Sequence, residues 1–239
     1  TLGEARPFEA ELLAALSDLP ITTLVQNIND ERTNRILGTS NRVLLGEGVI
    51  RDKIHELAFE ISPLSFFQNN PTQTDVLYSS ALEYAELTGN ETVFDIYCGI
   101  GTISLFLAGK AAKVVGIESV ESAISDARRN AALNGIEHTE FHVGKAEQLM
   151  PELHAQGVTA DVVVMDPPRK GCDKAVLQTL VAMAPRRLVY VSCNPQTLAR
   201  DLAWLVKQGF VLDEVQPVDM FPHSMHVEAV ARLSLPAKG

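Results

Sequence analysis

TVFDIYCGIGT, residues 92–102, is the stretch that decides the fold. The run TVFDIYC predicts a buried strand, glycines follow at positions 99 and 101, and a helical pattern begins at Ile103. Glycines let the backbone turn tightly and let a ligand approach it closely. Ligands of open α/β sheets bind beyond the carboxyl ends of the strands. The stretch therefore predicts an α/β domain with a nucleotide-type ligand at this turn.

The alternation of strand and helix continues along the chain. Apolar runs at 113–118, 139–144, 161–166 and 187–193 predict further strands, and helical patterns lie at 103–109, 120–134, 146–154, 174–184 and 195–209. Such strands predict a parallel sheet covered on both faces. The last two runs, 210–221 and 227–235, leave no room for a helix between them. We therefore expect a doubly wound, Rossmann-like α/β sheet, mostly parallel with an antiparallel end.

The first part of the chain has a different pattern. Residues 7–18 predict a short helix, runs at 21–28, 42–48 and 55–62 predict strands, and another helix begins near Thr72. No strand–helix–strand repeat is present there. We expect a small α+β central domain over residues 1–70 and the Rossmann-like catalytic domain over residues 71–239.

Composition limits the class of protein. Hydrophobic residues make up 46% of the 239 residues and charged residues 21%, as in ordinary globular proteins. No apolar run is long enough for a transmembrane helix and the start has no signal-peptide pattern, so we expect a cytoplasmic monomer without a membrane. The three cysteines predict no disulfide framework. The net charge of −10 requires any RNA contact to use a local basic patch.

Acidic residues around the glycine turn indicate which cofactor it binds. Asp95 precedes the glycines and would repel a pyrophosphate, and the third glycine of a GxGxxG motif is replaced by Ser104. Glu118 ends the next strand, 19 residues after Gly99, where it can accept hydrogen bonds from ribose hydroxyls. A ligand with a ribose and a positive charge fits this pattern. We therefore expect S-adenosylmethionine rather than NAD, although a glycine turn that merely connects two elements is the alternative.

The motif DPPRKG, residues 166–171, follows the strand at 161–166. Two prolines stiffen the chain and hold the Asp166 carboxylate beside the sheet edge, where it can accept a hydrogen bond from a base N–H. Arg169, Lys170 and Lys174 form a candidate phosphate-contacting patch. The alternative is a proline turn with solvated charges.

Cys193 ends the strand at 187–193, so it shares the sheet edge with the acids above. Asn194 and Pro195 are suited to begin a helix, which places the thiol at a positive helix end that favours the thiolate. We expect three arginines near in sequence, Arg186, Arg187 and Arg200, to add to this effect. Cys193 is therefore a candidate nucleophile, and the alternative is a buried structural thiol. The structural role is the one that we expect for Cys98 and Cys172.

The segment HSMHVE, residues 223–228, supplies the last candidate group. Glu228 begins the final strand and can point into the same cleft as a general base. A zinc site made of His223, His226 and Glu228 is one alternative, and simple exposure is another. The spacing does not place the three on one helix face, so we expect no metal.

Five motifs together resemble the RNA uracil-C5 methyltransferase family: FFQNN (66–70), DIYCGIGT (95–102), DPPRKG (166–171), SCNP (192–195) and HVE (226–228). The resemblance covers residues 20–235 and implies the class I S-adenosylmethionine-dependent methyltransferase fold. Residues 22–38 look closest to bacterial 23S ribosomal RNA members. The resemblance thus implies synthesis of 5-methyluridine in RNA and a role in rRNA processing.

The resemblance also implies the site residues. The cofactor site would contain Gln68, Tyr97, Glu118 and Asp166, with Gly99 and Gly101 shaping it. Cys193 would add to uracil C6, Glu228 would remove the C5 proton, and Asp166 would also contact the base.

Two features of that family are missing from this sequence. Its members usually carry an N-terminal TRAM domain, and many carry a four-cysteine iron–sulfur site. We therefore interpret the chain as a fragment without iron–sulfur cluster or metal. An adenine amino methyltransferase remains an alternative, although Arg169 stands where those enzymes have an aromatic residue. Arg169 also argues against a cytosine-C5 enzyme, and a non-catalytic RNA-binding fragment is the third alternative.

Overall fold

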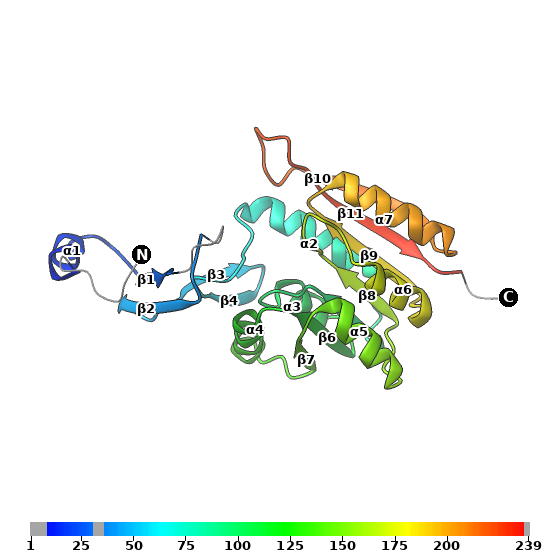
Figure 1. The fold of residues 1–239 in the computed structure, drawn as a ribbon, viewed down its shortest axis with the longest axis horizontal. Coiled ribbons are helices and arrows are strands. Elements are labelled where there is room, and N and C mark those ends of the chain that lie inside the picture. Colours follow the sequence, from blue (N-terminus) through cyan, green and yellow to red (C-terminus); the bar gives the residue numbers. More distant parts are fainter. Residues whose placement is uncertain (1–8, 31–35, 237–239) are drawn as a thin grey trace.

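A seven-stranded sheet forms the centre of the molecule (Figure 1). The computed structural model describes residues 9–30 and 36–236. The strands of the central sheet are β5 (Thr92–Ile96), β6 (Lys113–Glu118), β7 (Thr139–Val143), β8 (Val162–Met165), β9 (Arg187–Ser192), β10 (Val211–Val218) and β11 (Glu228–Ser234). Their order across the sheet is β10-β11-β9-β8-β5-β6-β7. The five strands from β5 to β9 are parallel, as the sequence predicts.

The antiparallel end of the sheet is also confirmed, with a specific arrangement. β11 pairs antiparallel with β10, with Val218 opposite Glu228, and it pairs antiparallel with β9 on its other side. The last strand in the sequence therefore lies between two strands that precede it. This insertion sets the start of β11 beside the end of β9.

Helices cover both faces of the sheet (Figure 1). They are α2 (Pro71–Ala85), α3 (Thr102–Ala108), α4 (Glu121–Leu133), α5 (Ala146–Ala155), α6 (Lys174–Met183) and α7 (Pro195–Lys207). One buried apolar cluster joins α2, α3 and α4 to sheet residues such as Val93 and Val164. The other joins α5, α6 and α7 to their chain neighbours Phe94 and Met165. Alternate residues of each strand thus face opposite cores, which explains why these strands are apolar throughout.

The N-terminal part contains α1 (Glu9–Leu16) and two small antiparallel sheets, β1 (Leu24–Ile28) with β2 (Ser40–Leu45) and β3 (Ile50–Ile54) with β4 (Leu57–Ile61). The first two residues of the predicted helix at 7–18 lie outside the described residues. The β3–β4 pair packs on α4, whose Asn130 and Asn134 side chains accept hydrogen bonds from the backbone N–H groups of Glu60 and Ala58 at 2.8 and 2.9 Å. Phe59 of β4 is fully buried in the α2–α4 core. The division at residue 70 stays a prediction.

No helix of the described ranges is both long enough and apolar enough to cross a membrane.

Candidate active site

The turn between β5 and α3 has the backbone shape that its glycines predict. Gly99 and Gly101 have φ values of +55° and +83°, and Tyr97 between them and β5 has φ +69°. A Cβ on Gly101 would lie 3.2 Å from the Ala127 Cβ, so this glycine lets α3 pack closely on α4. A Cβ on Gly99 would meet no protein atom within 4 Å. Gly99 therefore leaves space for a ligand, whereas Gly101 serves the packing of helices.

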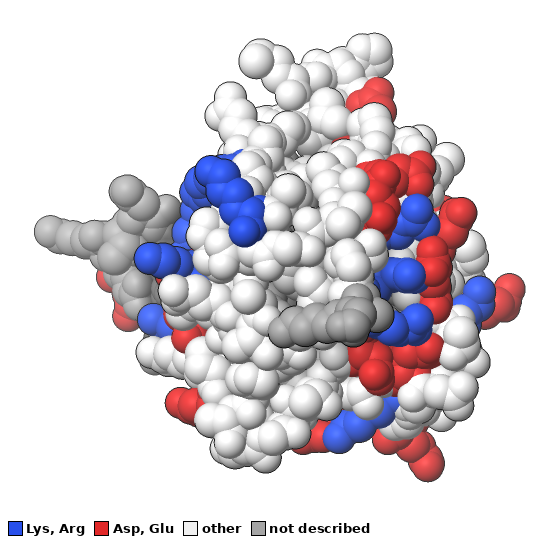
Figure 2. Space-filling view, turned by 90° about the vertical axis from the view of Figure 1, so that its right-hand side faces the viewer, with Lys and Arg blue, Asp and Glu red and all other residues white. Residues whose placement is uncertain are grey.

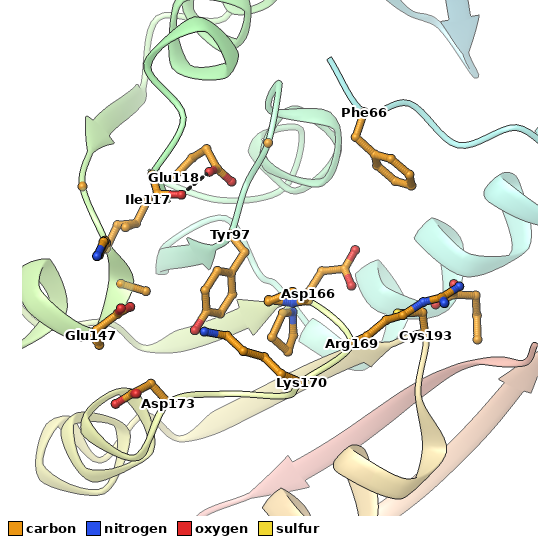
Figure 3. A pocket seen from close by; sticks show the side chains of 18 of the residues that line it. Phe66, Tyr97, Ile117, Glu118, Glu147, Asp166, Arg169, Lys170, Asp173 and Cys193 are labelled. Atoms are coloured by element: carbon orange, nitrogen blue, oxygen red, sulfur yellow. Dashed lines mark hydrogen bonds between the residues drawn. The ribbon is translucent and has the colours of Figure 1, made fainter. Parts of the chain in front are cut away.

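A cavity of about 680 Å³ opens at the carboxyl edge of the sheet (Figure 3). Its walls include seven residues predicted for the site: Gln68, Tyr97, Gly99, Glu118, Asp166, Cys193 and Glu228. The other two predicted residues, Asp95 and Gly101, do not line it. Phe66 and residues 144–147 at the start of α5 also line the cavity, although they were not predicted for the site. Phe66 is 70% exposed, and Figure 3 shows it across the cavity from Asp166.

Glu118 and Gln68 both line the cavity and offer it hydrogen-bond acceptors. Glu118 Oε1 accepts hydrogen bonds from Val120 N at 2.9 Å and Ser119 Oγ at 3.0 Å, which fixes the carboxylate at the end of β6. Gln68 is 8% exposed, and its Oε1 has no hydrogen-bond partner among the residues that the structure describes. A buried acceptor without a partner is costly. A ligand that donates a hydrogen bond to Gln68 would remove this cost.

Asp95 lies beneath the cavity rather than in its wall. It is fully buried, Ser104 Oγ donates a 2.5 Å hydrogen bond to its Oδ2, and its Oδ1 has no partner in the described part of the chain. Burial raises the pKa of Asp95 to about 7, with Glu118 adding to the rise and the Ser104 hydrogen bond opposing it. Ser104, which stands where a GxGxxG motif has its third glycine, thus holds the Asp95 carboxylate, a role that the sequence did not predict.

Three titratable groups from three strands meet at the other end of the cavity. Asp166 follows β8, Cys193 follows β9, and Glu228 begins β11. Burial, helped by the charges of Glu228 and Asp95, raises the pKa of Asp166 to about 7. Burial also raises the pKa of Glu228, which is 4% exposed. Both acids therefore hold their protons more tightly than exposed carboxyl groups do, as a proton acceptor working near neutral pH requires.

The electrostatics of Cys193 differ from the sequence prediction. Its thiol is half-buried and its pKa is raised, first by burial and then by the negative charges of Glu228 and Asp166. The expected cations are not there: Arg186 pairs with Glu91, and Arg187 pairs with Glu86. The third, Arg200, pairs with Asp201. They are near Cys193 in sequence but are held elsewhere by ion pairs.

Arg169 is the cation that lies beside the thiol (Figure 3). Its charge opposes the rise in the pKa of both Cys193 and Glu228. Its backbone carbonyl accepts hydrogen bonds from Asn194 Nδ2 at 3.0 Å and Thr197 Oγ1 at 3.2 Å, so the start of α7 fixes the DPPRKG loop. Asn194 is also the predicted cap of α7, since its Oδ1 accepts from Gln196 N at 3.0 Å. One asparagine therefore joins the loop of Arg169 to the helix that follows Cys193.

The two histidines of the HSMHVE segment are exposed, whereas Glu228 is buried. Across residues 9–30 and 36–236 there is no group of three or more His, Cys, Asp or Glu side chains that could hold a metal ion. Cys98 and Cys172 are buried free thiols, and burial raises the pKa of both.

The donor set fits S-adenosylmethionine. The Glu118 carboxylate can accept hydrogen bonds from ribose hydroxyls, Gln68 Oε1 can accept one from an ammonium group, and Gly99 leaves room for the ligand. The nearby acids favour a positively charged ligand over a pyrophosphate.

The fold defines the class of protein. The Rossmann-like sheet with its inserted antiparallel strand is that of the S-adenosylmethionine-dependent methyltransferases. An rRNA methylase from Streptococcus thermophilus shares this fold with 17% identity and a TM-score of 0.54 over 66% of this chain and 95% of that one.

Closer relatives define the family. A sequence model of the tRNA (uracil-5-)-methyltransferase family matches residues 41–235, and the chain belongs to this family. The tRNA (uracil-54, C5)-methyltransferase of Pyrococcus abyssi, solved with S-adenosyl-L-homocysteine, superposes with a TM-score of 0.81 and 32% identity over 98% of this chain and 54% of that one.

Two bacterial relatives are described as uncharacterized RNA methyltransferases. The Listeria innocua protein is 53% identical over 98% of this chain and 52% of its own length. The Oceanobacillus iheyensis protein is 58% identical over 90% of this chain and 47% of its own length. The chain thus spans about half the length of these relatives.

Proposed function

We propose that this chain methylates C5 of a uridine in RNA, with S-adenosylmethionine as the methyl donor. The observation that carries the proposal is the meeting of Cys193, Glu228 and Asp166 at one end of a cavity whose other end fits the donor. A base inside a duplex does not reach such a cavity, so the substrate is a single-stranded or flipped uridine. The Pyrococcus abyssi relative, by its title, acts on a tRNA uridine.

Uracil C5 is a poor nucleophile, and the protein must activate it. The Cys193 thiol first gives its proton to solvent water, and the Arg169 guanidinium stabilises the resulting thiolate. Attack of Sγ on C6 forms an S–C6 bond and moves the electrons of the C5–C6 double bond toward C5 and O4. Asp166 holds the ring by accepting its N3–H.

S-adenosylmethionine supplies, when bound, a methyl group on a positively charged sulfur. C5 would take this methyl group as the bond between the methyl carbon and the sulfur breaks, which would leave S-adenosylhomocysteine. Glu228 removes the remaining C5 proton, and the electrons of the C5–H bond restore the double bond as the S–C6 bond breaks. The free thiolate returns and the uracil is now 5-methyluracil. Gln68, Tyr97, Gly99 and Glu118 would hold the donor, above the buried Asp95 and the helix-packing Gly101.

Trapping with 5-fluorouridine RNA tests this chemistry. Fluorine at C5 cannot be removed as a proton, so the Cys193–C6 adduct should persist through denaturation and appear on a gel and in the mass spectrum. Cys193→Ala should abolish both the adduct and methylation while S-adenosylmethionine still binds. Cys98→Ala is the matched control, because this buried thiol lines neither the catalytic cavity nor the cavity between α6 and α7.

Each result separates the alternatives. Methylation that survives in Cys193→Ala would favour the amino methyltransferase, because an amine needs no thiol. RNA binding without adduct or methylation in the wild-type chain would favour a non-catalytic fragment. If the adduct forms in Cys98→Ala but not in Cys193→Ala, the covalent mechanism is supported.

The RNA class is a finer proposal. We infer 23S ribosomal RNA because residues 22–38 resemble ribosomal RNA members, although residues 31–35 of this segment lie outside the described part of the structure. Comparing methylation of unmodified 23S rRNA with that of unmodified tRNA tests it, and a preference for tRNA would reject it. Action as a cytoplasmic monomer stays a prediction.

A further inference from the structure

A second cavity, of about 460 Å³, lies beside the first between α6 and α7. Its walls include Lys170, Lys174, Arg200 and Trp204. Lys170 and Asp173 line both cavities, so only the loop at 170–173 separates them. A flexible polymer that leaves the catalytic cavity over this loop therefore reaches the second cavity directly.

The charge of the second cavity favours an anion. Lys170 and Lys174 are exposed and form no ion pair within 4 Å with any residue that the structure describes. The two acids beside them are already engaged. Asp173 Oδ1 caps α6 by accepting from Ala175 N at 2.8 Å, and Asp201, 2% exposed, accepts from Arg200. Positive charge thus remains available in a chain whose net charge is −10.

Lysine side chains without an acidic partner among the residues described distinguish this cavity from other basic parts of the surface. Figure 2 shows basic side chains that stand among acidic ones and others that stand apart from them. Arg187 and Arg232 both pair with the carboxylate of Glu86. Lys170 and Lys174 have no such partner among the residues described, so an anion does not have to displace one.

The loop that presents these cations is held rigidly. Arg200 Nη2 donates to the Lys170 carbonyl at 3.0 Å, and Cys172 N donates to Asp201 Oδ2 at 2.9 Å. Gly171 has φ +77°, and a Cβ there would lie 2.5 Å from Arg200 Nη2. The backbone therefore fits against Arg200 and Asp201 only with glycine at this position. A preorganised loop loses little conformational freedom when it binds.

Taking the proposed function as given, we propose that this second cavity binds a phosphate of the RNA strand next to the target uridine. Lys170 and Lys174 are the cations that contact it, and Arg200 fixes the loop that carries Lys170. Phosphate contacts fix the register of a nucleic acid on its protein, and a flipped nucleotide stays joined to its neighbours through phosphates. The partly buried Trp204 gives the neighbouring nucleotide an aromatic surface.

The experiment uses Trp204, which is the single tryptophan of the chain, as the reporter. The 239-residue chain is titrated with a uridine-containing single-stranded RNA while the tryptophan emission and the dissociation constant are recorded at several salt concentrations. We expect the emission to change as RNA binds. Lys174→Gln should weaken binding about tenfold and reduce the slope of log affinity against log salt by about 0.7, the value for one phosphate contact of a single strand.

Lys110→Gln is the matched control, since it removes the same charge from an exposed site outside both cavities. RNA that leaves the Trp204 emission unchanged, or Lys174→Gln with the affinity and salt slope of Lys110→Gln, overturns the proposal.

The same samples separate this proposal from the proposed function. Loss of affinity in Lys174→Gln together with unchanged methylation in Cys193→Ala means that the phosphate site stands and the covalent mechanism fails. Unchanged affinity in Lys174→Gln together with lost methylation in Cys193→Ala means the reverse.

Discussion

The two ends of the catalytic cavity are built on different physical principles. At the cofactor end, fixed hydrogen bonds and backbone shape prevail: Glu118 is held by Val120 and Ser119, and Gly99 leaves open space. At the reaction end, burial prevails and raises the pKa of Asp166, Cys193 and Glu228. Under the proposed function, the cofactor end is thus shaped to bind, whereas the reaction end is shaped to exchange protons.

This difference means that the two ends should fail in different ways. A change at the reaction end should slow chemistry and leave binding of the donor intact. A change at the cofactor end should weaken binding of the donor and leave the titrating groups intact.

The largest expected effect comes from Glu228→Gln at the reaction end. The amide keeps the shape of the side chain but does not accept the C5 proton, so methylation should fall by about 10² to 10⁴. The covalent adduct with ordinary uridine RNA should accumulate, because it forms before that proton leaves. A denaturing gel and single-turnover kinetics measure both quantities, and titration calorimetry should show unchanged donor affinity. Slow methylation without adduct would mean that Glu228 acts before the S–C6 bond forms.

The next effect concerns stability and tests whether burial also governs Asp95, beneath the cofactor end. Its pKa is raised from 3.8 to about 7, so between these values the folded state binds more protons than the unfolded state. Stability from this group therefore falls as pH rises through that window. The side chain of Asp95→Asn does not titrate, so the stability of this variant does not fall in that window. Its amide oxygen still accepts the Ser104 hydrogen bond. Relative to wild type, the variant should gain about 2 kcal/mol between pH 5 and pH 8 in urea unfolding.

The exposed Asp173, which caps α6, provides the control for that measurement. Asparagine caps a helix as well as aspartate does, so Asp173→Asn should show little change with pH relative to wild type. An equal gain in both variants would contradict the role of burial at Asp95.

The smallest of the three effects concerns Gly99→Ala at the cofactor end. The new methyl group would take space at the cavity wall, and the affinity for S-adenosylmethionine should fall about tenfold, as measured by calorimetry. Gly135→Ala has the same strain outside the catalytic cavity, because φ is +65° and a Cβ meets nothing within 4 Å. Both variants should lose about 1 kcal/mol of stability. Equal donor affinity in the two would show that Gly99 serves the backbone alone.

Much of the fold follows from the sequence because the parallel strands are apolar on both faces. β6 covers the predicted residues 113–118, and the predicted strand at 187–193 ends one residue later than β9. β3 (Ile50–Ile54) was not predicted, because its IRDKI sequence is mostly polar and exposed. The pairing of β11 with β9 also went unpredicted, since two adjacent runs do not reveal which one lies inside.

A site residue was predictable where its place at the end of a strand puts its side chain at the edge of the sheet that the other site residues share. Cys193 and Glu228 were found in this way, and the structure brings both to the cavity. The cation beside the thiol was predicted wrongly, because distance along the chain was taken for distance in space. Arg169 follows β8, the neighbour of β9, and adjacency of these strands was the signal that could have identified it.

The insertion of β11 also fixes the order in which the protein becomes active during its synthesis. β9 and β10 leave the ribosome before the strand that belongs between them, so Cys193 is made long before Glu228 arrives beside it. In the proposed mechanism, a nascent chain that stops short of residue 228 has its thiol but lacks the base that releases the product. Turnover would then begin only when the central gap in the sheet is filled.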